Sequence, residues 1–418
     1  MNKLHNKITP FLAVALAACT LTGCGNDKKA APPVRQRADV PVDPSLRQRL
    51  EAFAQERRPN GKFGFQVYDL TADKPVYGYN EHLAQPSASS MKLVSGVAAL
   101  HLLGTNYYYN TAVFTRGTMR QDTLQGDIAF KGSLDPQINA PDLAIFAKAL
   151  RRKGIRRVSG RVWVDLVISK PVTSEPHWYP WDLSFSKYGL FFKGAPRIVN
   201  EWKHALRNAG IAVADSQMVM GRVPKDVHCV FRFRRRVDTV IRRMWKNSSN
   251  TQATALLYAI GHKVNPKAEP TAAGVNYLRI FVRDSLALKD STLVIHDGCG
   301  LCTHNHLSPE ALTTVLRYGY QRKEIYRQLN LHLSIAGVDG TARQLLPGEI
   351  TRGKVRAKTG TLSHPYGISS LAGYVEGNDG HLLAFAIMDS EMSVLDAHVL
   401  QRKLCEAILK PNKEKKSR

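Results

Sequence analysis

The stretch Pro86–Leu93 reads PSASSMKL, and it places three serines and one lysine where a helix is predicted to begin. The segment that follows, 93–104 (LVSGVAALHLLG), has apolar side chains at the spacing of a helix face and ends on a glycine that suits a helix C-terminus. Residues three apart share a helix face, so Lys92 can reach Ser89. A Ser-x-x-Lys pattern is also common by chance, so its meaning depends on the rest of the chain.

Two further short motifs follow in order. Ser248-Ser-Asn250 lies in KNSSNTQATALL, at the start of another predicted helix, and Lys358-Thr-Gly360 lies in VRAKTGTLS, at the end of a predicted strand. Ser-x-x-Lys, Ser-Asp-Asn and Lys-Thr-Gly in this order are the motif set of penicillin-binding proteins and serine β-lactamases. Alone, Ser248 could be a helix cap and Lys358 a surface lysine. Together the three motifs indicate one active site.

The first motif supplies a nucleophile and a base. A serine hydroxyl is a weak nucleophile that needs an adjacent base. Ser89 is preferred to Ser87 and Ser90 because only Ser89 stands three positions before the lysine. Lysine becomes a base when burial and a second nearby cation lower its pKa. Lys92 is therefore the predicted base, and Lys358 could be the second cation.

The second motif supplies a proton route. Ser248 can pass a proton to the leaving amine, and Asn250 can hold Lys92 and the substrate amide by hydrogen bonds. The middle position is Ser249, where the usual residue is aspartate.

The third motif supplies substrate contacts. Lys358, with Thr359, can bind a substrate carboxylate as a compact charge. Gly360 permits the close approach of a substrate that lies along the strand edge. The backbone N–H groups of Ser89 and Thr361 would form the oxyanion hole.

The N-terminus is typical of an export signal. Basic residues precede the apolar run 11–19 (FLAVALAAC), which is too short to span a bilayer, and LTGC then ends on Cys24. This ending resembles a bacterial lipobox, whose cysteine is lipidated; an ordinary signal peptide or a short internal helix is the alternative. We expect a lipoprotein signal peptide at 1–24 and a Pro-rich tether at 25–44. The protein would then be exported, periplasmic and lipid-anchored to a bacterial membrane.

The chain is strongly basic, with a net charge of +25 and a pI near 9.9. Its basic residues are scattered over the whole length, so we do not expect a nucleic-acid partner. Attraction to anionic polymers or lipid headgroups of the cell envelope, or a plain solvated surface, fits the distribution better. The densest run, 232–246 (RFRRRVDTVIRRMWK), is predicted to be a helix with a cationic face, and 411–418 a disordered basic tail.

Four cysteines remain beyond the signal: Cys229, Cys299, Cys302 and Cys405. They allow three pairings, and the sequence cannot choose among them. Cys299-x-x-Cys302 with the nearby His304 and His306 also permits a zinc site, but the histidine spacing is short. Free thiols are the preferred interpretation, with a local disulfide as the alternative, and no metal or cofactor is expected.

The order of predicted elements indicates an α+β fold. Strands come first, helices dominate after residue 235, and strands with a closing helix come last, so the two chain ends should share one antiparallel sheet. We predict a serine β-lactamase/transpeptidase-like domain of 45–105 and 235–410, made of this sheet and a helical lobe. Residues 106–234 would form an inserted α+β subdomain.

With these residues in hand, the chain resembles the D-alanyl-D-alanine carboxypeptidase/endopeptidase family of low-molecular-mass, class C penicillin-binding proteins. The resemblance covers about 45–410 and includes GDIAFKGSLDP (126–136), GIRRVSGRVWVD (154–165) and AGVDGTARQ (336–344). It implies hydrolysis of D-Ala-D-Ala or D-Ala-diaminopimelate bonds of peptidoglycan stem peptides through an acyl-enzyme on Ser89. It also implies that β-lactams are covalent inhibitors.

Two departures from the family pattern stand out. A loop that resembles DGSGLSR reads DGCGLCT (297–303), and the insert is shorter than the usual two subdomains. Two other functions stay open beside the D,D-peptidase. One is a serine β-lactamase, for which no separate glutamate base is evident, and the other is a non-catalytic peptidoglycan-binding protein.

Overall fold

The computed structural model describes residues 43–58 and 60–411. The predicted signal peptide, nearly all of the tether and the basic tail fall outside this range, and so does Cys24. Within the described range, no helix has the length and apolarity that a bilayer span requires.

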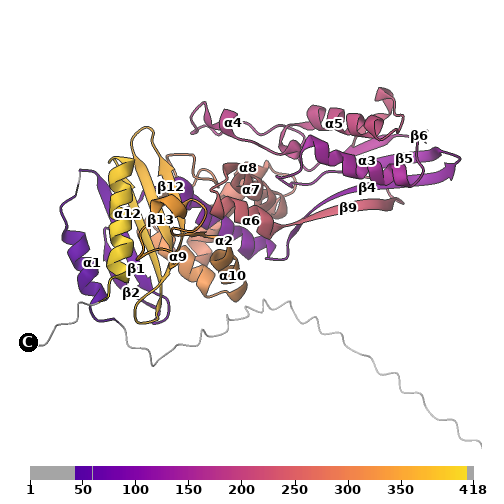
Figure 1. Cartoon of the computed structure of the whole chain (residues 1–418). Helices are drawn as coiled ribbons and strands as arrows, with labels where there is room; N and C mark the ends of the chain where they lie inside the picture. Colours follow the sequence, from indigo (N-terminus) through magenta and orange to yellow (C-terminus); the bar gives the residue numbers. More distant parts are fainter. Residues whose placement is uncertain (1–42, 59, 412–418) are drawn as a thin grey trace, which may run out of the picture. The chain divides into compact units, whose positions relative to one another are not determined.

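The predicted α+β architecture is confirmed by a central antiparallel sheet that both chain ends build. Its strands lie in the order β11-β12-β13-β14-β1-β2. The strands are β11 (Ser334–Ile335), β12 (Val355–Leu362), β13 (Ile368–Glu376), β14 (Leu382–Ser390), β1 (Lys62–Asp69) and β2 (Lys74–Tyr79). Strand β1 pairs with β14 along its whole length, so the start and the end of the chain close one sheet (Figure 1).

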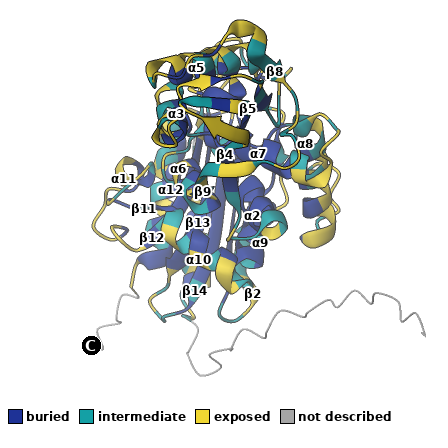
Figure 2. Ribbon diagram, turned by 90° about the vertical axis from the view of Figure 1, so that its right-hand side faces the viewer, coloured by how far each residue is buried: buried dark blue, intermediate teal, exposed yellow. Residues whose placement is uncertain are grey.

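Helices cover both faces of this sheet. On one face lie α1 (Leu46–Gln55) and α12 (Val394–Leu409), which share a buried cluster with Phe65, Val355 and Phe385. The helical lobe packs on the other face. Its helices are α2 (Met91–Leu103), α6 (Val237–Lys246), α7 (Asn250–Val264), α8 (Pro270–Ile280), α9 (Pro309–Tyr320) and α10 (Lys323–His332). Figure 2 shows how the buried residues run through these layers.

Helix α2 is apolar all round, and residues 91–100 are all buried. A helix of this kind belongs at the centre of a protein rather than on its surface. The short pair of β3 (Gln85–Pro86) and β10 (His306–Leu307) lies just before it, and the Ser87 N–H donates to the Asn305 carbonyl over 2.9 Å. This pairing holds the 297–305 loop beside the start of α2.

Residues between 108 and 236 build a second sheet, in the order β8-β7-β5-β4-β9 with β6 paired to β5. Helices α3 (Leu143–Arg152) and α5 (Ala195–Asn208) pack on one face of it. The strands are β4 (Tyr108–Arg120), β5 (Thr123–Lys131), β6 (Arg157–Val158), β7 (Val162–Asp165), β8 (Met218–Met220) and β9 (His228–Arg236). Two further helices are short: α4 (Asp182–Phe185) and α11 (Ala342–Leu345).

The prediction of a single helix over 232–246 was wrong. Residues 232–236 end strand β9, and α6 begins only at Val237. The alternation Arg232, Phe233, Arg234 has the period of a strand, which the density of arginines obscured.

Candidate active site

Ser89 stands in a 3₁₀ turn, Ala88–Ser90, that leads directly into α2. The Lys92 Nζ atom lies 2.8 Å from Ser89 Oγ, as the helical spacing predicted. The neighbouring serines face inward and are fully buried: Ser90 Oγ lies 2.7 Å from Ser370 Oγ, and Ser87 Oγ bonds to a carbonyl of its own turn. Of the three serines, only Ser89 is partly exposed.

The backbone around this serine is crowded. Ala88 has a φ of 43°, an unusual conformation for a residue with a side chain. A Cβ on Gly300 would lie 1.9 Å from the Ala88 carbonyl oxygen, and a Cβ on Gly360 would lie 2.9 Å from the Ser89 nitrogen. Both approaches therefore require glycine, which explains the position of Gly360 in the third motif.

Lys92 is fully buried, and burial lowers its pKa to about 8. Its Nζ donates to Ser89 Oγ, to Asn250 Oδ1 over 2.7 Å and to the Cys299 carbonyl. The Trp245 indole donates to the Lys92 carbonyl over 2.7 Å and fixes the backbone from the far side. The first and second motifs thus meet at one ammonium group.

Lys358, like Lys92, is fully buried. Its Nζ donates to Ser248 Oγ over 2.9 Å, which joins the third motif to the second. Burial, and then the like charge of Lys92, hold the pKa of Lys358 well below its ordinary value. Ser248 has a φ of 56°, so this hydroxyl is held on a strained turn just before α7.

The other residues of the third motif also belong to strand β12. Thr359 Oγ1 donates to Thr341 Oγ1 over 2.7 Å, and Thr341 was not singled out by the sequence. Thr361 is exposed and pairs with Ser369 on β13. Gly360 stands between them, against the Ser89 turn.

The 297–305 loop is organised by one buried carboxylate. Asp297 accepts hydrogen bonds from the backbone N–H groups of Cys299, Gly300 and Cys302 over 2.6–3.0 Å. It also accepts from the Trp178 indole over 2.8 Å. Trp178 belongs to the segment 171–188, so this segment braces the loop whose Cys299 carbonyl contacts Lys92. Nothing in the sequence linked the two segments.

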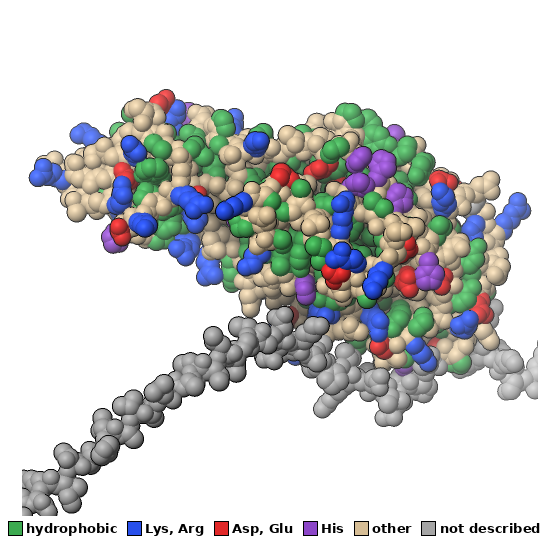
Figure 3. All heavy atoms as spheres, turned by 180° about the vertical axis from the view of Figure 1, so that it is seen from behind, with side chains coloured by type: hydrophobic (Ala, Val, Ile, Leu, Met, Phe, Trp, Pro, Cys, Tyr) green, Lys and Arg blue, Asp and Glu red, His purple; other side chains and the backbone are tan. Residues whose placement is uncertain are grey.

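None of the four described cysteines is paired: Cys229 is exposed, whereas Cys299, Cys302 and Cys405 are buried. The local disulfide is therefore absent from this structure. The rings of His177, His296 and His304 form a group with centroids 4.7–6.1 Å apart. Figure 3 shows histidines gathered on one face, but no set of three or more His, Cys, Asp or Glu side chains in the described residues is arranged to hold a metal ion.

A groove opens beside the second motif. Its walls come from the 136–139 segment, from α4 and the residues after it, from α6 and from Ser249 and Asn250. Asp182, Lys187 and Arg243 give it charges of both signs. Gln137 Nε2 donates to Gln252 Oε1 over 2.9 Å and ties the second sheet's loop to α7.

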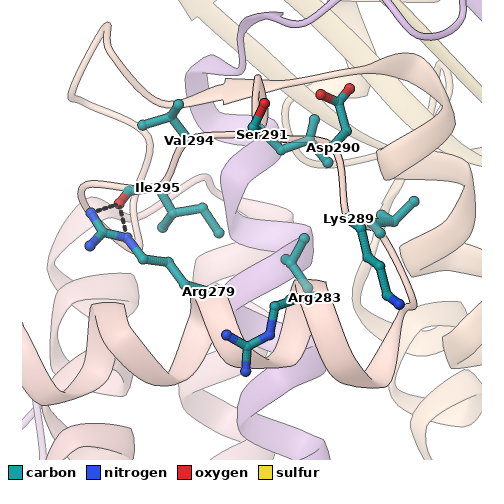
Figure 4. Close-up of a pocket in the computed structure, with 10 residues that line it drawn as sticks. Arg279, Arg283, Lys289, Asp290, Ser291, Val294 and Ile295 are labelled. Atoms are coloured by element: carbon teal, nitrogen blue, oxygen red, sulfur yellow. Dashed lines mark hydrogen bonds between the residues drawn. The ribbon is translucent and has the colours of Figure 1, made fainter.

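A second cavity lies between α8 and the 288–295 segment. Arg279 spans one side of it and donates twice to the Ile295 carbonyl, over 2.6 and 3.0 Å (Figure 4). None of the motif residues lines this cavity. The groove beside the second motif, by contrast, is lined by Asn250 of that motif.

The family model and two curated relatives that match this chain all describe D-Ala-D-Ala carboxypeptidases. A model of the D-Ala-D-Ala carboxypeptidase 3 (S13) family matches residues 46–189 and 191–407. The chain is 20% identical to D-alanyl-D-alanine carboxypeptidase DacB of Haemophilus influenzae, over 79% of this chain and 86% of that protein. It is 22% identical to a D-alanyl-D-alanine carboxypeptidase of Actinomadura sp. (82% and 81%).

Solved structures show the same fold. Penicillin-binding protein 4 from H. influenzae superposes with a TM-score of 0.72 at 17% identity, over 88% of this chain and 99% of that one. A predatory peptidoglycan endopeptidase from Bdellovibrio bacteriovorus, Bd3459, superposes with a TM-score of 0.57 at 15% identity, over 82% and 92%.

Proposed function

The chain belongs to the D-Ala-D-Ala carboxypeptidase 3 (S13) family and is a serine D,D-peptidase, and we propose that it works through an acyl-enzyme on Ser89. The substrates would be D-Ala-D-Ala or D-Ala-diaminopimelate bonds of peptidoglycan stem peptides. The contact of one buried lysine with both Ser89 and Asn250 carries this proposal. An isolated buried cation would be costly, whereas a lysine that can release its proton suits a general base.

The proposed acylation starts with neutral Lys92. It removes the proton from Ser89 Oγ as the oxygen attacks the carbonyl carbon of the penultimate D-alanine. Backbone N–H groups of Ser89 and Thr361 stabilise the oxyanion. The C–N bond then breaks, the departing amine takes a proton through Ser248, and water later hydrolyses the Ser89 ester.

Lys358 would hold the carboxylate at the end of the substrate. A carboxylate beside Lys358 raises the pKa of that lysine, because it stabilises the ammonium form. Thr359, whose hydroxyl is held by Thr341, would contact the same carboxylate.

We also propose that the protein is exported and anchored by a lipid on Cys24. The basic start, the short apolar run and the LTGC ending support this. Mass spectrometry of the mature N-terminus would show a diacylglyceryl-modified Cys24 as the first residue. An unmodified residue at any other position would contradict the anchor.

The experiment that tests the function uses two soluble substrates. The mature chain is incubated with a pentapeptide that ends in D-Ala-D-Ala and with a cross-linked stem-peptide dimer, and products are identified by mass. We expect release of D-alanine, cleavage of the dimer, or both, and loss of each in Ser89→Ala with an unchanged circular dichroism spectrum. A folded wild type that cleaves neither would favour a binding protein, and rapid penicillin turnover instead would favour a β-lactamase.

A further inference from the structure

The second sheet carries a row of cations on the face opposite to its helices. The register places Lys131 of β5 and Arg232 of β9 on either side of Ala112 of β4, so both side chains point to the same face. Arg234 follows two positions along β9. These residues, with Arg116 and Arg236, form what we call the cationic sheet face, and all five are exposed.

Helices α3 and α5 cover the other face of this sheet. There Phe130 and Phe231 contact Phe146 of α3, with ring centroids 5.6 and 5.3 Å apart, and Phe130 stacks on Trp202 of α5 at 4.7 Å. In Figure 1, α3 and α5 lie above the sheet and β9 forms its lower edge. The register places Phe130 and Phe231 opposite Val113, whereas Lys131 and Arg232 stand opposite the next residue, Ala112, so the cations point away from α3 and α5. Figure 3 shows cationic side chains over this part of the molecule.

The charges on this face are largely unneutralised. Within the described residues, no ion pair joins Lys131, Arg232 or Arg234 to a carboxylate. Arg116 is paired with Asp127, and Arg236 lies 3.2 Å from Asp238. Like charges held side by side repel one another, so a folded protein gains little from this row unless an anion covers it.

One aromatic ring supports a cation of this face. The guanidinium of Arg234 lies 4.1 Å from the centre of the Tyr108 ring, which holds the charge over the sheet instead of letting it extend freely. Successive cations on β9 stand about 7 Å apart, because alternate residues of a strand share a face. The result is a regular row of positive charge that ends on the edge strand β9.

We propose that the cationic sheet face binds the cross-linked peptidoglycan polymer around the stem peptide that is being cleaved. This inference rests on the proposed function, which makes peptidoglycan the substrate. Stem peptides carry several free carboxylates, so the polymer is an extended polyanion and complements a row of cations. A polymeric contact outside the active site would raise the local concentration of stem peptides at the groove.

The test compares two triple variants of the mature chain with equal loss of charge. One is K131Q/R232Q/R234Q on the cationic sheet face. The other is K148Q/R152Q/K153Q on and just after α3, on the helical side, where the three side chains are also exposed and have no ion pair among the described residues. Binding is measured by sedimentation with insoluble peptidoglycan sacculi at several salt concentrations. Turnover of a soluble pentapeptide and penicillin acylation are measured on the same samples.

We expect the sheet-face variant to bind sacculi at least about tenfold more weakly than the wild type, with a smaller salt dependence, and the α3 variant to stay within about twofold. Both variants should cleave the soluble pentapeptide and acylate as the wild type does, which shows that they are folded. Equal binding by the wild type and the sheet-face variant would overturn the inference, as would an equal loss in both variants.

Binding of the same variants to anionic phospholipid vesicles distinguishes a lipid partner from peptidoglycan. If the same face instead governs binding to anionic phospholipid vesicles while sacculi sediment unchanged, the partner is a lipid surface and the inference fails. If the wild type cleaves no soluble stem peptide at all, the proposed function fails, and this outcome is distinguishable because it involves no sheet-face variant.

Discussion

At the scale of single residues, the site depends on backbones that approach more closely than side chains allow. Gly300 and Gly360 bring the 297–305 loop and strand β12 against the turn that carries Ser89. Each is a position where conformation and space, rather than chemistry, select glycine. The site residues named from the three motifs lie together because these two close approaches exist.

Gly360→Ala tests this crowding. The new Cβ would lie 2.2 Å from Ser370 Oγ and 2.9 Å from the Ser89 nitrogen, so Ser89 must shift. We expect penicillin acylation to slow by about 100-fold, because a displacement of about 1 Å of a reacting group has this cost. Gly348→Ala is the matched control, since the nearest atom lies 3.9 Å from its added Cβ. Equal acylation rates in the two variants would show that the turn can adapt.

The pH dependence of acylation follows from Lys92. Its pKa is lowered to about 8, and only the neutral form can accept the proton of Ser89. The neutral fraction falls about tenfold for each pH unit below the pKa, so the acylation rate should rise with pH and level off above about pH 8. Stopped-flow or mass measurements from pH 6 to 9 check this. A flat profile over this range would contradict the role of Lys92 as base.

At this scale the sequence predicted which residues of the candidate site lie together in the structure. The three motifs and their order indicated Ser89, Lys92, Ser248, Asn250 and Lys358, since each is a chemical type at a fixed spacing. Thr341 and Trp178 could not be found in this way. Their partners stand 18 and 119 positions away and are set by the fold alone.

At the scale of elements, the segment 171–188 is joined to the 297–305 loop by the Trp178 indole. Trp178 donates to Asp297, Asp297 orders the loop, and the Cys299 carbonyl of that loop accepts from Lys92. Trp178 is thus a positioning residue. The carboxylate it contacts is buried, so the hydrogen bond is worth more than one on the surface.

Trp178→Phe removes this hydrogen bond and keeps most of the apolar contact. We expect the acylation rate to fall by about tenfold, because a hydrogen bond to a charged buried group contributes about 1.5–3 kcal/mol. Trp181→Phe on the same segment is the control, since Trp181 is 45% exposed. Recovery of the rate in Trp178→His, which restores an N–H donor, would support positioning. An unchanged rate in Trp178→Phe would refute it.

Helices and strands could be predicted where the spacing of apolar residues was clear. The closing helix and the last three strands follow the sequence pattern closely, because their apolar spacing is long and regular. Strand β9 was missed, since arginines at alternate positions look like a basic helix when the pattern is short. Only the pairing of β9 with β4 reveals which of its side chains face outward.

At the scale of the whole molecule, the first and last described parts of the chain pack together. Strand β1 pairs with β14, and α1 packs on α12, so residues 46–69 complete a sheet and a core that end near residue 409. The order of strands, helices and strands predicted this closure. The register, and the position of the second sheet's loops at the groove, came from the structure.

The cysteines show how burial differs across the fold. Burial raises the pKa of Cys302 to about 11 and holds that of Cys299 well above its usual value, whereas Cys229 is exposed on β9. Among the four described cysteines, a thiol reagent at pH 8 should modify Cys229 rapidly and the three buried ones only after denaturation. Peptide mapping checks this. Protection of Cys229, or a 299–302 disulfide in the map, would contradict the described state.

Covalent labelling by penicillin tests whether Ser89 is the nucleophile. The mature chain is mixed with benzylpenicillin and its intact mass is followed, with Ser89→Ala beside it and peptide mapping to locate the adduct. We expect one adduct per chain, on Ser89. It should persist for many minutes and be absent from the folded Ser89→Ala protein. An adduct elsewhere, or no adduct on a folded wild type, would contradict this role of Ser89.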